Sequence, residues 1–143
     1  MRPGQCGTDP RAQLLPGDQV EVDRFEAYLK ERTVKPKVVC ICGSMRFAAL
    51  MQEHAAAESL SGRIVVMPHV SMAIWGARLA NPDESMRELG QLHRAKIRMA
   101  SEMLVVGDYV GDSTRAEITY ARWLGLPVRF THPDVDPGTE ADR

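Results

Sequence analysis

The chain lacks a long apolar run, and no stretch approaches the roughly 18 residues that cross a bilayer. It also lacks an excess of one charge, since 18 Lys and Arg residues face 19 Asp and Glu residues and leave a net charge of −1. A near-neutral chain offers no general attraction for nucleic acid or anionic lipid, although a local basic patch can still bind a phosphate. We therefore expect no nucleic acid polymer and no membrane among its partners.

Cysteine is scarce, and its placement excludes a disulfide framework. The chain has three cysteines, Cys6, Cys40 and Cys42, which is too few and too unevenly spaced for a stapled secreted domain. Cys40 and Cys42 stand one residue apart in an apolar run, which is typical of small residues in a strand. Neither the cysteines nor the four histidines have the spacing of zinc ligands. The sequence therefore predicts no metal and no cofactor.

The 143 residues suffice for one hydrophobic core. We predict a flexible leader over residues 1–16, an N-terminal helix within 17–35, an α/β domain over 36–131 and a flexible tail over 132–143. The leader is polar, rich in Gly and Pro, and without the apolar centre of a secretion signal. The expected location is therefore the cytoplasm.

Short β-branched runs alternate with helical patterns through the α/β domain. Strands are predicted at 37–42, 63–67, 102–106 and 127–130, and helices at 18–32, 45–60, 83–100 and 113–124, with 69–82 irregular. Such connections form right-handed crossovers. The expected fold class is α/β: a single flavodoxin- or Rossmann-like domain, with an open, mainly parallel sheet of about four or five strands and helices on both faces. Ligands of these sheets bind beyond the carboxyl ends of the strands.

The segment after the first strand, Cys42-Gly43-Ser44-Met45-Arg46, has the composition of an anion site. Gly43 permits a tight turn, Ser44 can cap the next helix, and Arg46 can add a charge-assisted contact. A plain strand-to-helix turn with a serine cap explains the same residues. The segment matches neither the P-loop nor the dinucleotide-binding fingerprint, so neither nucleoside-triphosphate hydrolysis nor the usual dinucleotide binding is supported.

The segment after the third strand, residues 107–117, holds two glycines, two aspartates and a glutamate. Glu117 would lie near the mouth of a site, where a carboxylate can attack an anomeric carbon. Thr114 and Glu117 fit a capping box equally well, in which Glu117 only bonds back to the helix start. Asp112 is a candidate ligand for a sugar hydroxyl, although a turn residue explains it too.

Histidine and tryptophan supply the remaining candidates. His93 falls on the apolar face of the helix over 83–100, where a satisfied core histidine is the commoner finding. His69 and Trp75 lie in the irregular segment 69–82. Trp75 could stack on a base, although a single aromatic is more often a packing anchor.

Three stretches together resemble the nucleoside 2-deoxyribosyltransferase superfamily, and within it the 2′-deoxynucleoside 5′-monophosphate N-glycosidases. VCICGSMRF is similar to that branch's first strand and phosphate loop. ASEMLVV is similar to a later strand, which usually begins Ala-Asp, and GDSTRAEITYARWLGLPV to its loop, catalytic glutamate, helix and closing strand. The resemblance covers residues 37–130, and the order and spacing of the motifs carry it.

The resemblance implies an enzyme that cleaves or transfers the N-glycosidic bond of a nucleoside 5′-monophosphate. Glu117 would be the nucleophile, and His93 would replace, as general acid, an aspartate that the family usually has and that residues 91–97 lack. The implied partners are a small-molecule nucleotide or nucleoside and a second copy in a homodimer or higher homo-oligomer. The substrate-binding candidates are Gly43, Ser44, Met45, Arg46, His69, Trp75, Gly111, Asp112 and Ser113.

Three other function classes stay open. The missing aspartate allows a non-catalytic module of the same fold that binds or senses a nucleotide. A purely structural or partner-binding domain is a second class. A dinucleotide or flavin oxidoreductase is a third, which the fold permits and the absent glycine fingerprint disfavours.

Overall fold

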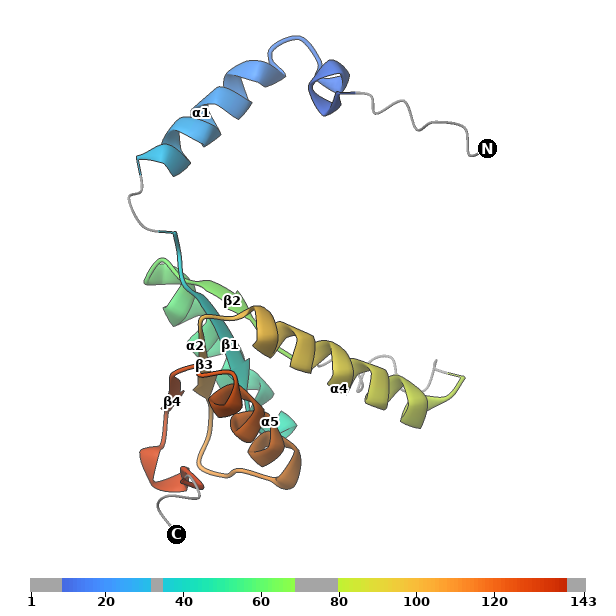
Figure 1. Ribbon diagram of the computed structural model, residues 1–143, viewed down its shortest axis with the longest axis vertical. Coiled ribbons are helices and arrows are strands. Elements are labelled where there is room, and N and C mark those ends of the chain that lie inside the picture. The colour runs from blue at the N-terminus through green and yellow to red at the C-terminus, as the bar shows by residue number, and fades with distance from the viewer. Residues whose placement is uncertain (1–8, 32–34, 69–79, 139–143) are drawn as a thin grey trace. The chain divides into compact units, whose positions relative to one another are not determined.

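The computed structural model describes residues 9–31, 35–68 and 80–138, and the chain divides into two compact units, 1–35 and 36–143 (Figure 1). In the first unit, a 3₁₀ turn at Pro10–Gln13 precedes α1, Asp18–Lys30. The helix predicted over 18–32 is therefore present and ends slightly early. No residue of α1 is buried.

The second unit is built on a four-stranded sheet with the order β2-β1-β3-β4. All of its pairings are parallel. The strands are β1 (Val38–Cys42), β2 (Ile64–Val66), β3 (Glu102–Val105) and β4 (Val128–Phe130). The predicted fold class, an open parallel α/β sheet of the Rossmann or flavodoxin type, is confirmed.

Helices cover both faces of this sheet: α4 and α5 pack on one face and α2 on the other (Figure 1). Their bounds are α2 (Ala48–Leu60), α4 (Pro82–Met99) and α5 (Asp112–Trp123). A 3₁₀ turn, η2 (Met45–Phe47), leads into α2. The helix predicted over 45–60 therefore begins with this tighter turn.

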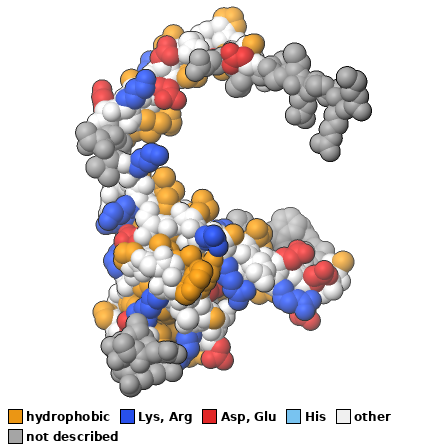
Figure 2. All heavy atoms as spheres, in the orientation of Figure 1, with side chains coloured by type: hydrophobic (Ala, Val, Ile, Leu, Met, Phe, Trp, Pro, Cys, Tyr) orange, Lys and Arg blue, Asp and Glu red, His pale blue; other side chains and the backbone are white. Residues whose placement is uncertain are grey.

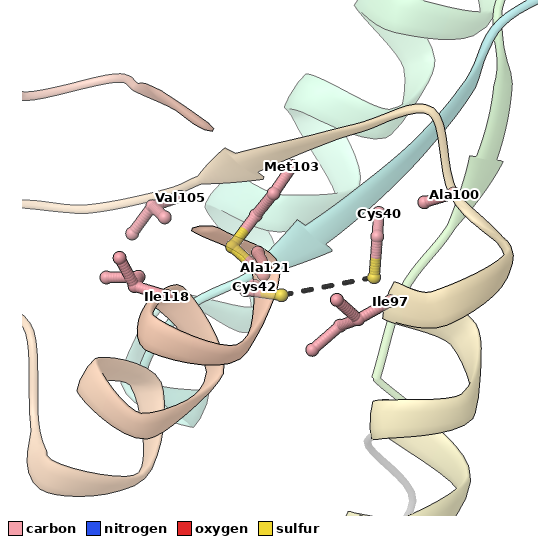
Figure 3. Packing of buried hydrophobic residues seen from close by; sticks show 8 residues of the cluster. All are labelled: Cys40, Cys42, Ile97, Ala100, Met103, Val105, Ile118 and Ala121. Atoms are coloured by element: carbon pink, nitrogen blue, oxygen red, sulfur yellow. Dashed lines mark hydrogen bonds between the residues drawn. The ribbon is translucent and has the colours of Figure 1, made fainter. Parts of the chain in front are cut away.

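Strand β1 feeds a separate core on each face, because successive side chains of a strand point to opposite sides. Cys40 and Cys42 pack with residues of α4 and α5, among them Ile97 and Ile118 (Figure 3). Val39 and Ile41 belong to the core beneath α2, with Met51, Leu104 and Val106. All four β1 residues are fully buried, as expected for a central parallel strand.

Two glycines let the loops after β1 and β3 meet closely. A Cβ atom on Gly43 would lie 2.6 Å from the Val106 carbonyl oxygen, and one on Gly107 would lie 2.2 Å from the Phe47 ring. Both glycines have positive φ, at 152° and 103°, which side chains disfavour. The two loops are therefore fixed against each other at the carboxyl edge of the sheet.

A cluster of ion pairs ties α2 to the sheet. One terminal nitrogen of Arg129 lies 3.1 Å from a carboxylate oxygen of both Glu58 and Glu102. Arg63 contacts the same two carboxylates at 3.0 and 3.4 Å. Because both glutamates are nearly buried and doubly paired, we assign this cluster a structural role.

Charge on the visible surface is mixed rather than gathered. On the face in Figure 2, Lys and Arg side chains are interspersed with Asp and Glu, in keeping with the net charge of −1. Within residues 9–31, 35–68 and 80–138, no helix is long and apolar enough to cross a membrane.

Candidate functional site

A cavity of about 870 Å³ lies beyond the carboxyl ends of β1 and β3. From β1 the chain moves to β2 on one side of the sheet, whereas β3 lies on the other side. The cavity is therefore at the topological switch point, where open α/β sheets bind their ligands. Its walls come from the loops after these two strands and from the facing sides of α4 and α5.

The cavity brings together most of the predicted site residues. Its lining includes Gly43, Ser44, Met45, Arg46, His93, Gly111, Asp112, Ser113 and Glu117. These residues come from three separate segments of the chain, 43–46, the middle of α4 and 111–117. His69 and Trp75, the other two candidates, lie outside the described residues.

Glu117 faces the cavity from α5, and the capping-box interpretation of it is wrong. Helix α5 begins at Asp112, and Gly111 takes the capping position without a side-chain hydrogen bond. Thr114 therefore lies inside the helix, where it is buried. Released from a capping role, Glu117 places its Oε2 atom 3.7 Å from Nε2 of His93.

The surroundings of Glu117 keep its carboxyl poised between two protonation states. Only 12% of its side chain is exposed, and this burial raises the pKa of Glu117 to about 7. The positive charge of Arg94 and a hydrogen bond with Cys42 oppose that shift. A carboxyl with such a pKa, inside a cleft, is typical of acid, base or nucleophile in a reaction.

His93 contacts Glu117 and is more deeply buried, with only 5% of the residue exposed. Its Nε2 atom lies 3.1 Å from the Cys42 sulfur, and its Nδ1 atom has no hydrogen-bond partner among the described residues. Burial, followed by the charges of Lys96 and Arg94, lowers the pKa of His93 to about 4. The imidazole is therefore neutral near pH 7, which favours a positioning role over the predicted proton donation by an imidazolium.

The outer part of the cavity is polar. Ser44 makes no capping hydrogen bond, so the predicted serine cap is wrong and its hydroxyl group lines the cavity instead. The guanidinium of Arg46 lies 4.1 Å from the centre of the Tyr109 ring, a cation–π contact that limits its orientations. Asp112 and Ser113 line the cavity from the first turn of α5.

Sequence reasoning missed several lining residues. Met86, Leu89 and Gly90 precede His93 on the same side of α4, and extending the helical period back from His93 would have found them. Tyr109 carries no such signal, because it lies in a loop without a period. Tyr109 contributes to the site by limiting the orientations of Arg46 through their cation–π contact.

Behind the cavity wall, three side chains with soft or borderline metal-ligating atoms converge. The sulfurs of Cys40 and Cys42 are 3.9 Å apart (Figure 3), and both lie within 4.8 Å of the ligating nitrogen of His93. His93 is separated from Cys42 by 51 positions, so sequence spacing gave no sign of this cluster. Burial raises the pKa of the Cys42 thiol.

Comparison with known proteins adds no identity. Neither a scan against protein-family models nor a search of curated proteins found a match to the chain. The function is therefore inferred from the chemistry of the cavity together with the resemblance described above.

Proposed function

We propose that the chain cleaves the N-glycosidic bond of a nucleoside 5′-monophosphate, with 2′-deoxyribose as the preferred sugar. The observation that carries the proposal is Glu117, a nearly buried carboxyl with a pKa of about 7 in a switch-point cavity. The cavity volume of about 870 Å³ lies within the range of small-molecule sites. Its outer wall offers hydroxyl groups and a guanidinium for a phosphate.

In this proposal the nucleotide enters with its phosphate among Ser44, Arg46 and Ser113, at the loops after β1 and β3. Asp112 is the candidate partner of a sugar hydroxyl. The C1′ carbon then faces Glu117 on the inner wall. This orientation follows from the polarity of the lining, which is charged at the outer loops and apolar along α4 at Met86 and Leu89.

Glu117, as a carboxylate, attacks C1′ while the bond from C1′ to the base nitrogen breaks, and the electron pair leaves with the base. The product is a glycosyl ester of Glu117. Water then attacks the same carbon and gives up a proton, which the departed base takes up, and the ester bond breaks to regenerate the carboxylate and release the sugar phosphate. If a second base attacks instead, the result is transfer. This is the two-step course of retaining glycosidases.

His93 supports this chemistry as a positioning residue. Its neutral imidazole and the Cys42 thiol both contact Glu117. Burial beside two neutral groups leaves the carboxylate poorly solvated, which raises its free energy relative to one in water. An ionised Glu117 is therefore a better nucleophile than an exposed glutamate.

A second candidate is a module that binds the nucleotide without cleaving it. It is favoured by the absence of a carboxylate at residues 91–97 of α4 and by a histidine that is neutral near pH 7. Both features remove the acid that would assist departure of the base. This candidate predicts thermal stabilisation by nucleotides with no free base released.

The experiment is a chromatographic assay for free base. Wild type, Glu117→Gln and the exposed-site control Glu53→Gln are incubated with each common deoxyribo- and ribonucleotide monophosphate and with the matching nucleosides. Base released by wild type and by E53Q, but not by folded E117Q, supports the proposal. Nucleotide-dependent stabilisation without base release favours the binding module. If nucleotides neither stabilise the chain nor lose their base, both candidate functions are contradicted.

The resemblance also implies a homodimer or higher homo-oligomer, which stays a prediction. Sedimentation equilibrium of the purified chain checks it against the 15.9 kDa mass of one copy. A mass of one copy at all concentrations would contradict it.

A further inference from the structure

Behind His93 and Glu117, which line the cavity, lie two cysteines that the proposed reaction uses only in part. Cys40 and Cys42 are two positions apart on β1, so their side chains point to the same face of the sheet. His93 reaches them from α4 and Glu117 from α5. Cys40, Cys42 and His93 thus bring two sulfurs and one imidazole nitrogen within 4.8 Å of one another, and a carboxylate oxygen of Glu117 lies 3.7 Å from that nitrogen.

The spacing of these atoms is close to that of a tetrahedral metal site. The usual zinc bond lengths give separations of about 3.8 Å between two sulfurs, about 3.6 Å between sulfur and nitrogen and about 3.4 Å between nitrogen and oxygen. The observed separations are 3.9 Å between the sulfurs, 3.1 Å from the Cys42 sulfur to Nε2 and 3.7 Å from Nε2 to Oε2 of Glu117.

We propose that Cys40, Cys42, His93 and Glu117 form a binding site for a thiophilic divalent ion, with Zn²⁺ as the expected metal. On binding, the two thiols and any protonated Glu117 release their protons to solvent, while the neutral imidazole binds as it is. Thiolate and imidazole ligands select zinc and its chemical relatives over Mg²⁺ or Ca²⁺. His93 and Glu117 line the cavity, which gives the ion a route from solvent to the buried sulfurs.

The site has a consequence for the reaction, and this consequence alone rests on the proposed function. A metal-bound Glu117 shares its negative charge with the ion and is a much weaker nucleophile toward C1′. Zinc should therefore inhibit base release. Metal binding itself does not depend on whether the chain is an enzyme.

The test is a titration of the reduced, metal-free full chain with Co²⁺, which reports thiolate ligation by an intense near-ultraviolet charge-transfer band. We expect one equivalent of Co²⁺ to bind with this band and with the visible spectrum of a tetrahedral ion, and Zn²⁺ to displace it. Cys42→Ala, Cys40→Ala and His93→Gln should each lose the band. Cys6→Ser and His54→Gln remove the same kinds of side chain elsewhere and should keep it.

A wild-type chain without the band, or a band that persists in C40A and C42A, would overturn the proposal. If C42A fails to fold by circular dichroism, C40A decides, because it does not touch the contact between Cys42 and His93. E117Q should still bind Co²⁺, at least tenfold more weakly. Base release by wild type is measured separately, so a wild-type chain that binds Co²⁺ but releases no base faults the proposed reaction and not the metal site.

Discussion

Replacing Glu117 with glutamine should stabilise the protein, and the gain should depend on pH. The pKa of this carboxyl moves from 4.5 to about 7 because burial penalises its charged form. Glutamine keeps the shape of the side chain and never ionises. The substitution therefore removes the cost of holding a negative charge beside His93 and Cys42.

The size of the gain follows from linkage between folding and ionisation. Below about pH 4.5 Glu117 is protonated in both the folded and the unfolded chain, so its ionisation contributes nothing. As the pH rises toward 7, the unfolded chain ionises first, and folding stability falls until the folded carboxyl has ionised as well. A pKa raised from 4.5 to about 7 corresponds to about 3 kcal/mol of unfolding free energy. Glutamine keeps only part of the contacts, so about 2 kcal/mol is expected at pH 8 and under about 1 kcal/mol at pH 5.

Urea denaturation of wild type and E117Q at pH 5 and pH 8 measures this difference directly. In thermal melts the gain at pH 8 should amount to roughly 5 to 10 °C. E53Q serves as the control, because Glu53 is exposed on α2 and should shift stability little at either pH. If the difference in unfolding free energy between E117Q and wild type is the same at pH 8 as at pH 5, burial does not raise the pKa of Glu117.

Three further substitutions test the cavity and its frame. Gly107→Ala places a Cβ atom against the Phe47 ring and should lower the free energy of unfolding by about 3 kcal/mol. The control Gly125→Ala has open space around its Cβ atom at positive φ and should lower that free energy by about 1 kcal/mol. Equal urea midpoints for the two variants would contradict the loop contact. The leucine side chain of Gly90→Leu has room at the cavity wall and would fill part of the cavity. The chain should therefore fold, while its nucleotide affinity, measured by calorimetry, falls at least tenfold. An unchanged affinity would show that the nucleotide binds elsewhere. Arg46→Ala removes a charge-assisted contact and should raise KM for nucleotides by about 10- to 100-fold but leave KM for nucleosides unchanged; an equal rise for both would show that Arg46 does not bind the phosphate.

The fold was predictable because its signals are local. The run that became β1 is apolar and rich in β-branched residues, and the run that became β3 is apolar after Glu102, so both predicted buried strands of a parallel sheet from pattern alone. Element ends depended on finer contacts. Helix α4 begins at Pro82, one residue before the prediction, because Asn81 accepts a hydrogen bond from the Glu84 amide and the proline suits the first turn.

The candidate site was predictable only in outline. Ser44 and Glu117 follow strands in the sequence, so their meeting at one edge of the sheet followed from topology. The neighbours that set the chemistry of Glu117 were not predictable. His93 and Cys42 are 51 positions apart, and their closeness depends on how α4 packs on β1. Whether Glu117 belongs to a capping box or to the cavity likewise depended on the residue at which α5 begins, and sequence patterns do not locate helix ends to within one or two residues.

The most direct measurement is the pH dependence of kcat/KM for base release, in wild type and in Arg94→Ala. If Glu117 attacks as a carboxylate, kcat/KM rises with pH through an apparent pKa near 7. Because the charge of Arg94 lowers the pKa of Glu117, R94A should move this limb to higher pH, which titration of the substrate phosphate cannot do. Arg98→Ala, an exposed arginine one turn further along α4, should leave it in place. A rate that falls as the pH rises through 7, or a limb that R94A does not move, would contradict Glu117 as the nucleophile.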